Sequence, residues 1–229
     1  GNLCRCTGYE PIFKAARAAA ELGKPEADPL QAERADVTAA LEAMNDGVRV
    51  EVGGAILPSD VADFADVLAE QPDATIIAGA TDVGLWVTKM MKPIAPAIFT
   101  GHLSELRHVT LSDKSLMIGA GASYSEAEGP LVQAFPHLAD YWSRIAGWQV
   151  RNMGTVGGNI ANGSPIGDTP PVFIALGARL HLRSAEGKRA VPLEDYFIDY
   201  GKQALQAGEF VEAVELPLPK AGAIHAAYK

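Results

Sequence analysis

The sequence has few cysteines, no cluster of basic residues and no long apolar run. Its 229 residues hold two cysteines, and the formal net charge is −9. Nucleic-acid binding depends on clustered lysine and arginine, so we expect no such partner. No apolar stretch reaches the roughly 20 residues of a transmembrane helix, and no basic segment leads into an apolar one as in a secretory signal. We therefore expect a cytoplasmic protein with no membrane partner.

The composition and the spacing of apolar residues predict a globular chain with several parts. Hydrophobic residues make up 48% of the sequence, which is ample for a buried core. Pro11 and the alanine-rich run Ile12–Leu22 predict a helix. The charged segment 24–34 predicts an exposed linker, and Asp36 is expected to cap a short helix after it. We therefore expect three parts, residues 1–24, 25–48 and 49–229.

Beyond residue 48, helical and strand-like patterns alternate. Ser59 is expected to cap a helix with one apolar face. The other expected elements are a strand at 75–78, a helix at 82–92, a strand at 116–118, a helix around 138–145 and a hairpin strand at 179–183 that turns at 186–188. Mixed helices and hairpins favour an α+β fold over a doubly wound parallel sheet.

The cysteine pair Cys4-Arg5-Cys6 is the most informative motif. Two cysteines this close are poorly placed for a disulfide, but they can chelate one soft metal. An iron–sulfur cluster needs four thiolate ligands, and this chain supplies two. The pair is thus either two inert thiols or half of a metal site.

Two glycine-rich loops are the candidate ligand-binding segments. The first glycine loop, residues 79–84, follows an apolar strand and leads into a helix. Glycine amides can approach an anion closely, which outlines a cradle for a diphosphate. The second glycine loop, residues 151–168, interleaves five glycines with Asn, Thr, Ser and Asp, so it can wrap a long polar ligand. Neither loop matches a P-loop or a Rossmann fingerprint, and tight turns alone are the structural alternative.

The residues around these motifs resemble one family. Gly1-Asn2-Leu3-Cys4-Arg5-Cys6-Thr7-Gly8-Tyr9 resembles the last ligand segment of the [2Fe-2S] domain in molybdenum hydroxylases, where an upstream Cys-x-x-Cys completes the cluster. Both glycine loops resemble the FAD-binding stretches of the xanthine dehydrogenase family, in its bacterial iron–sulfur/FAD subunit. The resemblance implies that the chain is a fragment that starts inside a larger polypeptide.

The resemblance also implies a fold and its domains. The fold is the two-lobed α+β fold shared with flavoproteins of the vanillyl-alcohol-oxidase (PCMH) type. Residues 1–24 would be the C-terminal end of a [2Fe-2S] domain, and 25–48 an interdomain linker with a short helix. Residues 49–229 would be the FAD-binding PCMH-type domain, without the C-terminal flavin subdomain that follows in the family.

The resemblance further implies the ligands. Cys4 and Cys6 would bind the cluster as two of its four ligands. The FAD pyrophosphate would lie on the first glycine loop, where Thr81 and Asp82 would hold it and the ribityl region. Val211 would pack on the isoalloxazine, and Lys229 would contact the flavin. The remaining implied FAD contacts are Ile76, Ile77, Ala78, Gly79, Ala80 and Val83 from the first stretch, Thr155, Gly158, Asn159, Asn162 and Asp168 from the second, and Ile145 and Ala146 near the adenine.

The implied function is electron transfer in a xanthine dehydrogenase. Hypoxanthine or xanthine would be hydroxylated at a molybdopterin-binding large subunit, which alone carries the molybdenum cofactor. Electrons would pass through [2Fe-2S] clusters to FAD and then to NAD⁺, in a heterotetramer of two small and two large subunits. The protein binds and tunes such a cofactor, so no catalytic residue is assigned.

Other functions are consistent with the same residues. One is the flavin subunit of an aldehyde or carbon monoxide dehydrogenase-like enzyme. Another is a flavoprotein of the UDP-N-acetylenolpyruvylglucosamine reductase type, which has no use for the cysteine pair. A third is an assembly scaffold whose loops are only structural.

Overall fold

The computed structural model describes residues 8–24, 28–199, 201–220 and 222–229. The chain divides into two compact units, Gly1–Val48 and Arg49–Lys229. Within the described residues, no helix combines the length and apolar composition that crossing a membrane requires.

The described residues of the first unit form two helices, α1 (Tyr9–Leu22) and α2 (Pro29–Met44), and no side chain in either range is buried. The alanine-rich helix of α1 is confirmed. The second helix begins at Pro29 rather than near Asp36, where the sequence predicted its cap. Asp28 accepts a hydrogen bond from the Leu30 amide at 3.0 Å, and a proline suits the first helical position. Asp28 therefore caps this helix about two turns before the predicted cap at Asp36.

The second unit begins with a four-stranded sheet in the order β1-β2-β4-β3. Its strands are β1 (Val50–Val52), β2 (Ala55–Leu57), β3 (Thr75–Ile77) and β4 (Ala97–Phe99). β4 pairs in parallel with both β2 and β3, and β1 pairs antiparallel with β2. The helices α3 (Val61–Glu70) and α4 (Val83–Thr88) connect these strands.

Helix α3 is capped by Asp60, whose side chain accepts from the Asp63 amide at 2.8 Å. The expected cap, Ser59, lies one position too early and instead donates its amide to the Asp63 carboxylate at 2.8 Å. Asp63 also forms an ion pair with Arg49. This helix turn is thus held by carboxylates rather than by a hydroxyl.

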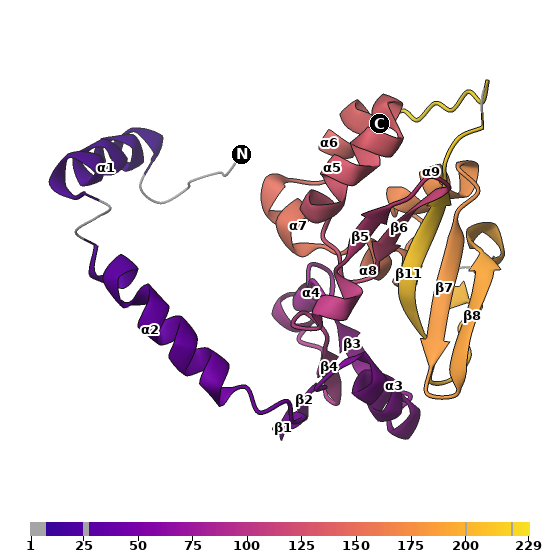
Figure 1. Cartoon of the computed structure of the whole chain (residues 1–229), viewed down its shortest axis with the longest axis horizontal. Coiled ribbons are helices and arrows are strands. Elements are labelled where there is room, and N and C mark those ends of the chain that lie inside the picture. The colour runs from indigo at the N-terminus through magenta and orange to yellow at the C-terminus, as the bar shows by residue number, and fades with distance from the viewer. Residues whose placement is uncertain (1–7, 25–27, 200, 221) are drawn as a thin grey trace. The chain divides into compact units, whose positions relative to one another are not determined.

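A five-stranded antiparallel sheet forms the larger part of the second unit, in the order β5-β6-β11-β7-β8 (Figure 1). Its strands are β5 (Val109–Leu111), β6 (Ser115–Gly119), β7 (Arg179–Ser184), β8 (Gly187–Pro192) and β11 (Phe210–Pro217). The expected hairpin is confirmed, since Ser184 pairs with Gly187. The short strands β9 (Phe197–Asp199) and β10 (Lys202–Gln203) form a separate pair. Two sheets with helices between their strands confirm the α+β expectation.

The helices of this larger part lie between β6 and β7 in the chain. They are α5 (Tyr124–Ala134), α6 (Ala139–Ser143), α7 (Trp148–Met153), α8 (Val156–Ala161) and α9 (Thr169–Ala175). Short 3₁₀ turns occur at Ser104–Leu106, Pro136–Leu138 and Leu193–Asp195. Helix α5 carries a capping box in which Ser123 and Glu126 satisfy each other's amides.

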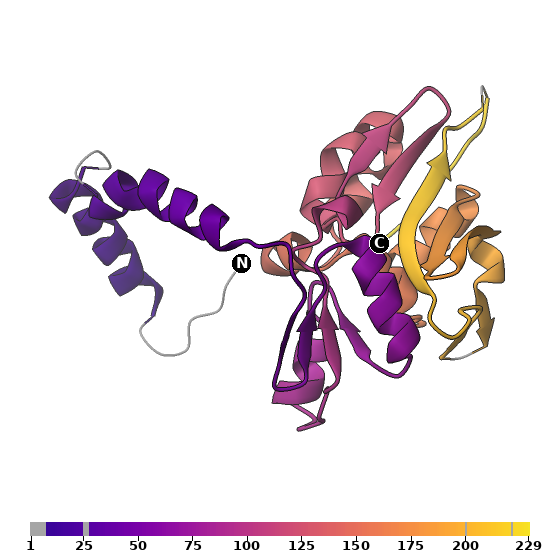
Figure 2. The same ribbon diagram turned by 60° about the horizontal axis from the view of Figure 1, so that its bottom comes forward.

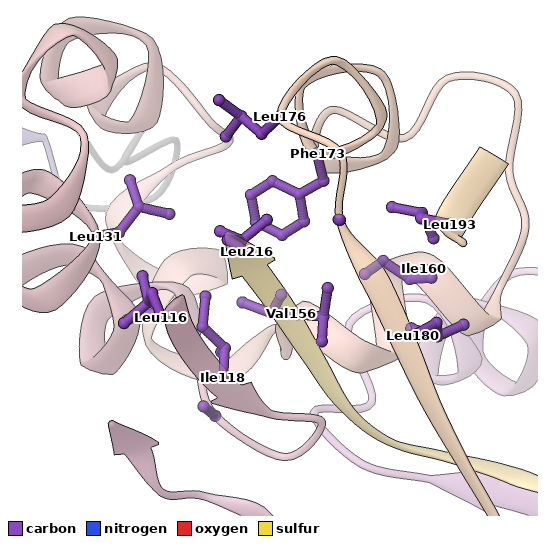
Figure 3. Close-up of a cluster of buried hydrophobic side chains, with 14 of the residues drawn as sticks. Leu116, Ile118, Leu131, Val156, Ile160, Phe173, Leu176, Leu180, Leu193 and Leu216 are labelled. Atoms are coloured by element: carbon purple, nitrogen blue, oxygen red, sulfur yellow. The ribbon is translucent and has the colours of Figure 1, made fainter. Parts of the chain in front are cut away.

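The main core fills the space between these helices and the five-stranded sheet (Figure 3). Val156 and Ile160 of α8 and Phe173 of α9 are fully buried against Leu180 and Leu216 of the sheet. Burial of each such side chain contributes about 1.5–3 kcal/mol relative to exposure. This packing fixes α8, and with it the second glycine loop, to a rigid support.

A second core joins the two sheets. Helix α3 lies beside β7 and β11 (Figures 1 and 2). The ring of Phe64 on α3 contacts the ring of Phe210, at the start of β11, with centroids 4.2 Å apart. Phe210 belongs to the core of the four-stranded sheet, whereas later residues of β11 belong to the main core. The long strand β11 therefore contributes to both cores.

Candidate functional site

The two glycine loops meet directly. Gly79 lies so close to the end of α7 that a Cβ built on it would stand 1.9 Å from the carbonyl oxygen of Met153. A Cβ built on Gly154 would be 3.4 Å from the Thr81 hydroxyl oxygen. Segments some seventy residues apart therefore form one continuous wall, and glycine is required where their backbones touch.

A cavity of about 540 Å³ lies over this wall. The volume falls within the roughly 300–1,000 Å³ of ligand and cofactor pockets. All but two of the sequence-predicted FAD contacts line it. They are Ile76, Ala78, Gly79, Ala80, Thr81, Asp82, Val83, Ile145, Ala146, Thr155, Gly158, Asn159, Asn162, Asp168 and Val211.

The two exceptions are Ile77 and Lys229. Side chains alternate along a strand, so β3 presents Ile76 to the cavity and buries Ile77 in the core, where it is 4% exposed. Lys229 reaches the site indirectly, through an ion pair with the Asp168 carboxylate. Residues 222–229, which end in Lys229, form neither helix nor strand in the structure.

The first glycine loop presents unpaired backbone donors. Ala80 adopts a left-handed φ of 56°, and its carbonyl accepts the Gly84 amide at 2.8 Å as α4 begins. Among the described residues, no protein acceptor is found for the amides of Gly79, Ala80 and Thr81. Unpaired amides beside a cavity are suited to an anionic oxygen of a ligand.

The turn at Ile145 and Ala146 forms the next part of the wall, and an arginine holds it. Arg151 on α7 donates to the carbonyls of Ser143, Ile145 and Ala146, each at 3.0 Å. Ala146 has a left-handed φ of 50°. A non-glycine residue in this region costs of order 1 kcal/mol, and such strain concentrates at functional sites. Ala80 and Ala146 both line the cavity, so strained backbone occurs in two separate segments of its lining.

The second glycine loop is held by caps and packing. The Thr155 hydroxyl accepts the Gly158 amide at 3.1 Å and so caps α8. Gly157 donates to the Ala120 carbonyl at 3.0 Å, and its Cα lies so close that a Cβ would stand 2.4 Å from the Ala120 Cα. The Thr169 hydroxyl donates to the Asn159 side-chain oxygen at 2.6 Å. The loop is therefore preorganised from its buried side.

The charges around the cavity are acidic. Asp73, Asp82, Asp168 and Glu209 line it, and no Lys, Arg or His is found among its described lining residues. Arg189 binds Glu209 through two contacts of 2.6 and 2.7 Å, which hold the pKa of Glu209 below its usual value. A bound diphosphate would thus be held by neutral amides and hydroxyls.

Several lining residues carry no recognisable sequence signal. Trp86 follows the first loop, and Lys92 lies over its ring at 4.5 Å from the centroid. Tyr124 is buried at 4% exposure, and burial raises its pKa. Phe64 and Leu205 come from distant parts of the chain. Only the tertiary fold brings these four side chains to the cavity.

The predicted cluster ligands Cys4 and Cys6 lie outside the described residues. In the part of the chain that the structure describes, no group of three or more His, Cys, Asp or Glu side chains is arranged to hold a metal ion. The iron–sulfur prediction therefore stays a prediction.

Comparison with known proteins places the chain in a family. The FAD binding domain in molybdopterin dehydrogenase matches residues 33–219. The putative xanthine dehydrogenase FAD-binding subunit XdhB of Escherichia coli K12 is 34% identical over 174 residues, which are 73% of this chain and 60% of that protein. Nicotinate hydroxylase hnxS of Emericella nidulans is 31% identical over 181 residues, which are 72% of this chain and 13% of that protein.

Solved structures agree in fold. A Cu,Mo-CO dehydrogenase chain aligns with a TM-score of 0.68 and 27% identity, over 73% of this chain and 60% of that one. Quinoline 2-oxidoreductase from Pseudomonas putida 86 aligns with a TM-score of 0.63 and 29% identity, over 71% and 58%. The chain spans less than two thirds of each of these proteins. The chain belongs to the family of FAD binding domains of molybdopterin dehydrogenases, and it has their two-lobed α+β fold of the PCMH type.

Proposed function

We propose that the cavity between the two glycine loops binds FAD through those predicted contact residues that line it. The free amides of the first loop, with Thr81 and Asp82, would hold the pyrophosphate and the start of the ribityl chain. Thr155, Gly158, Asn159, Asn162 and Asp168 would line the flavin, Val211 would pack on the isoalloxazine, and Ile145 and Ala146 would lie near the adenine. The observation that carries this proposal is the contact between Gly79 and the Met153 carbonyl, which closes both loops around one cavity.

The roles of these residues are to bind and orient. Bound FAD supplies a carrier that accepts and releases electrons singly or in pairs. The amides of the first loop would donate hydrogen bonds to the diphosphate oxygens and so stabilise their charge. Ala80 and Ala146 hold two segments of the wall in left-handed turns, and the buried packing of α8 keeps the second loop in place. Lys229 acts on the site by pairing with Asp168.

For the whole enzyme, we propose the electron-transfer part of a xanthine dehydrogenase. Hypoxanthine or xanthine would be hydroxylated at a molybdopterin-binding large subunit, and electrons would reach this FAD through [2Fe-2S] clusters, one of them bound by Cys4 and Cys6. NAD⁺ would accept them, in a cytoplasmic heterotetramer of two small and two large subunits. The similarity to the E. coli FAD-binding subunit supports this choice. A related hydroxylase of another substrate is the alternative, because relatives include nicotinate hydroxylase and CO dehydrogenase.

The FAD proposal is tested by flavin titration of the full-length protein. We expect one FAD per chain, and Thr81→Val should weaken FAD binding about tenfold by removing one hydrogen-bonding hydroxyl. Thr88→Val is the matched control, because the Thr88 hydroxyl bonds the Gly84 carbonyl on α4 and lies outside the cavity lining. Equal affinities of all three proteins, or a wild type without flavin, would contradict the proposal.

The substrate is tested on the assembled enzyme under anaerobic conditions. Bleaching of the flavin absorbance by xanthine, followed by its recovery on addition of NAD⁺, is the expected result. Bleaching by an aldehyde, nicotinate or CO but not by xanthine would overturn the xanthine assignment and leave the FAD site intact.

A further inference from the structure

The Thr169 side chain, behind the second glycine loop, is a buried hydroxyl in contact with a residue that lines the cavity. Thr169 is 1% exposed and Tyr124 is 4% exposed. The Thr169 hydroxyl donates to the side-chain oxygen of Asn159 at 2.6 Å, and Asn159 lines the cavity. A buried hydroxyl usually has a defined partner, and here that partner faces the ligand space.

The contact restricts how Asn159 can act. An asparagine side chain offers one acceptor oxygen and one NH₂ donor group. Thr169 engages the oxygen, and the NH₂ group of this half-buried side chain has no hydrogen-bond acceptor in the part of the chain that the structure describes.

We propose that Thr169 is a positioning residue that orients the Asn159 amide so that its NH₂ group, and not its oxygen, faces the bound dinucleotide. The inference rests on the proposed FAD site. Asn159 would then donate to an acceptor oxygen or ring nitrogen of FAD. The opposite orientation would present an oxygen to the acceptor-rich rim of a flavin and would leave Thr169 to accept from the amide.

Three substitutions separate these orientations. Asn159→Asp keeps an oxygen for Thr169 but cannot donate to the ligand, so we expect at least tenfold weaker FAD binding with little change in the unfolding temperature of the free protein. Thr169→Val is nearly isosteric and has a similar helix propensity. It should weaken FAD about fivefold to tenfold, because the freed amide can rotate, and Thr169→Ser should restore wild-type affinity.

The measurements are FAD dissociation constants and FAD-free unfolding temperatures of the full-length wild type and the three variants. Competition of FMN and of ADP with FAD locates the acceptor. If Asn159→Asp weakens the binding of FMN but not of ADP, the acceptor lies on the flavin half. If it weakens the binding of ADP but not of FMN, the acceptor lies on the adenylate half. Unchanged FAD affinity in Asn159→Asp overturns the inference, as does a Thr169→Ser variant as impaired as Thr169→Val. A wild type that binds no FAD instead overturns the proposed function itself.

Discussion

The substitution Gly79→Ala tests whether the contact between the loops is what forms the site. Its new Cβ would stand 1.9 Å from the Met153 carbonyl oxygen, 2.7 Å from the Met153 carbonyl carbon and 3.0 Å from the Gly154 Cα. Every one of these is a backbone atom, so no side-chain rotation can relieve the overlap. Because real Cβ atoms almost never approach closer than 3.0 Å, the loops must separate by about 1 Å.

The free-energy cost of separating the loops lies within a known range. Overpacking a well-packed interior costs about 1–3 kcal/mol, and about 1.4 kcal/mol corresponds to a factor of ten in an equilibrium constant. In the free protein the loops can part to relieve the overlap, whereas a ligand held by both loops needs them together. We therefore expect FAD affinity to fall about fivefold to 150-fold, with a smaller loss of stability in the free protein.

The matched control is Gly84→Ala, in the same loop. A Cβ at Gly84 would meet nothing within 4 Å. Since Gly84 lies inside α4, alanine should even stabilise the helix by about 0.5–1 kcal/mol. FAD dissociation constants from flavin fluorescence titration, with unfolding temperatures of the free proteins, give the comparison. If Gly79→Ala binds FAD like the wild type, or Gly84→Ala is equally impaired, the reasoning is refuted.

Three further predictions follow from the packing and charges of the site. Gly157→Ala should lower both the unfolding temperature and FAD affinity, because its Cβ would stand 2.4 Å from the Ala120 Cα; wild-type values in both measurements would contradict this. Raising NaCl from about 0.05 to 0.5 M should not weaken FAD binding more than about threefold, since no basic side chain is found among the described lining residues; a tenfold loss would indicate a cation on the diphosphate. Arg189 lowers the pKa of Glu209 below 4.5 in the folded state, so this contribution to stability is present above about pH 4.5 and is lost as the pH falls through the lower, folded-state pKa. Below that pH, the free energy of unfolding measured in urea should therefore fall more for the wild type than for Glu209→Gln. Equal falls in both proteins would show that the Arg189–Glu209 pair does not contribute in this way.

The sequence was sufficient for the parts of the site that follow from local rules. Thr75–Ile77 forms the strand before the first loop as predicted, and both loops line one cavity with the residues that the family resemblance implied. Alternation along β3 also explains the exception, because neighbouring side chains of a strand point to opposite faces. That rule places Ile77 in the core and could have been applied to the sequence.

The remaining features depend on tertiary contacts that no local pattern encodes. Gly79 reads as a loop glycine, and its need for close backbone approach becomes visible only when Met153 is beside it. Thr169 reads as the first residue of a short helix, whereas its role depends on Asn159, ten residues earlier. The start of α2 at Pro29 is the reverse case, because its signal is local. Asp28 and Pro29 form a recognisable helix start, although the charged residues around them suggested a linker.

Hydrogen exchange of the full-length protein with and without FAD tests the central claim most directly. The amides of Gly79, Ala80 and Thr81 have no protein acceptor among the described residues, so they should exchange fast in the free protein. We predict that FAD slows the first glycine loop and residues 157–162 of the second together, at the same FAD concentration. Protection of only one loop, or of neither, would contradict a single dinucleotide site formed by both.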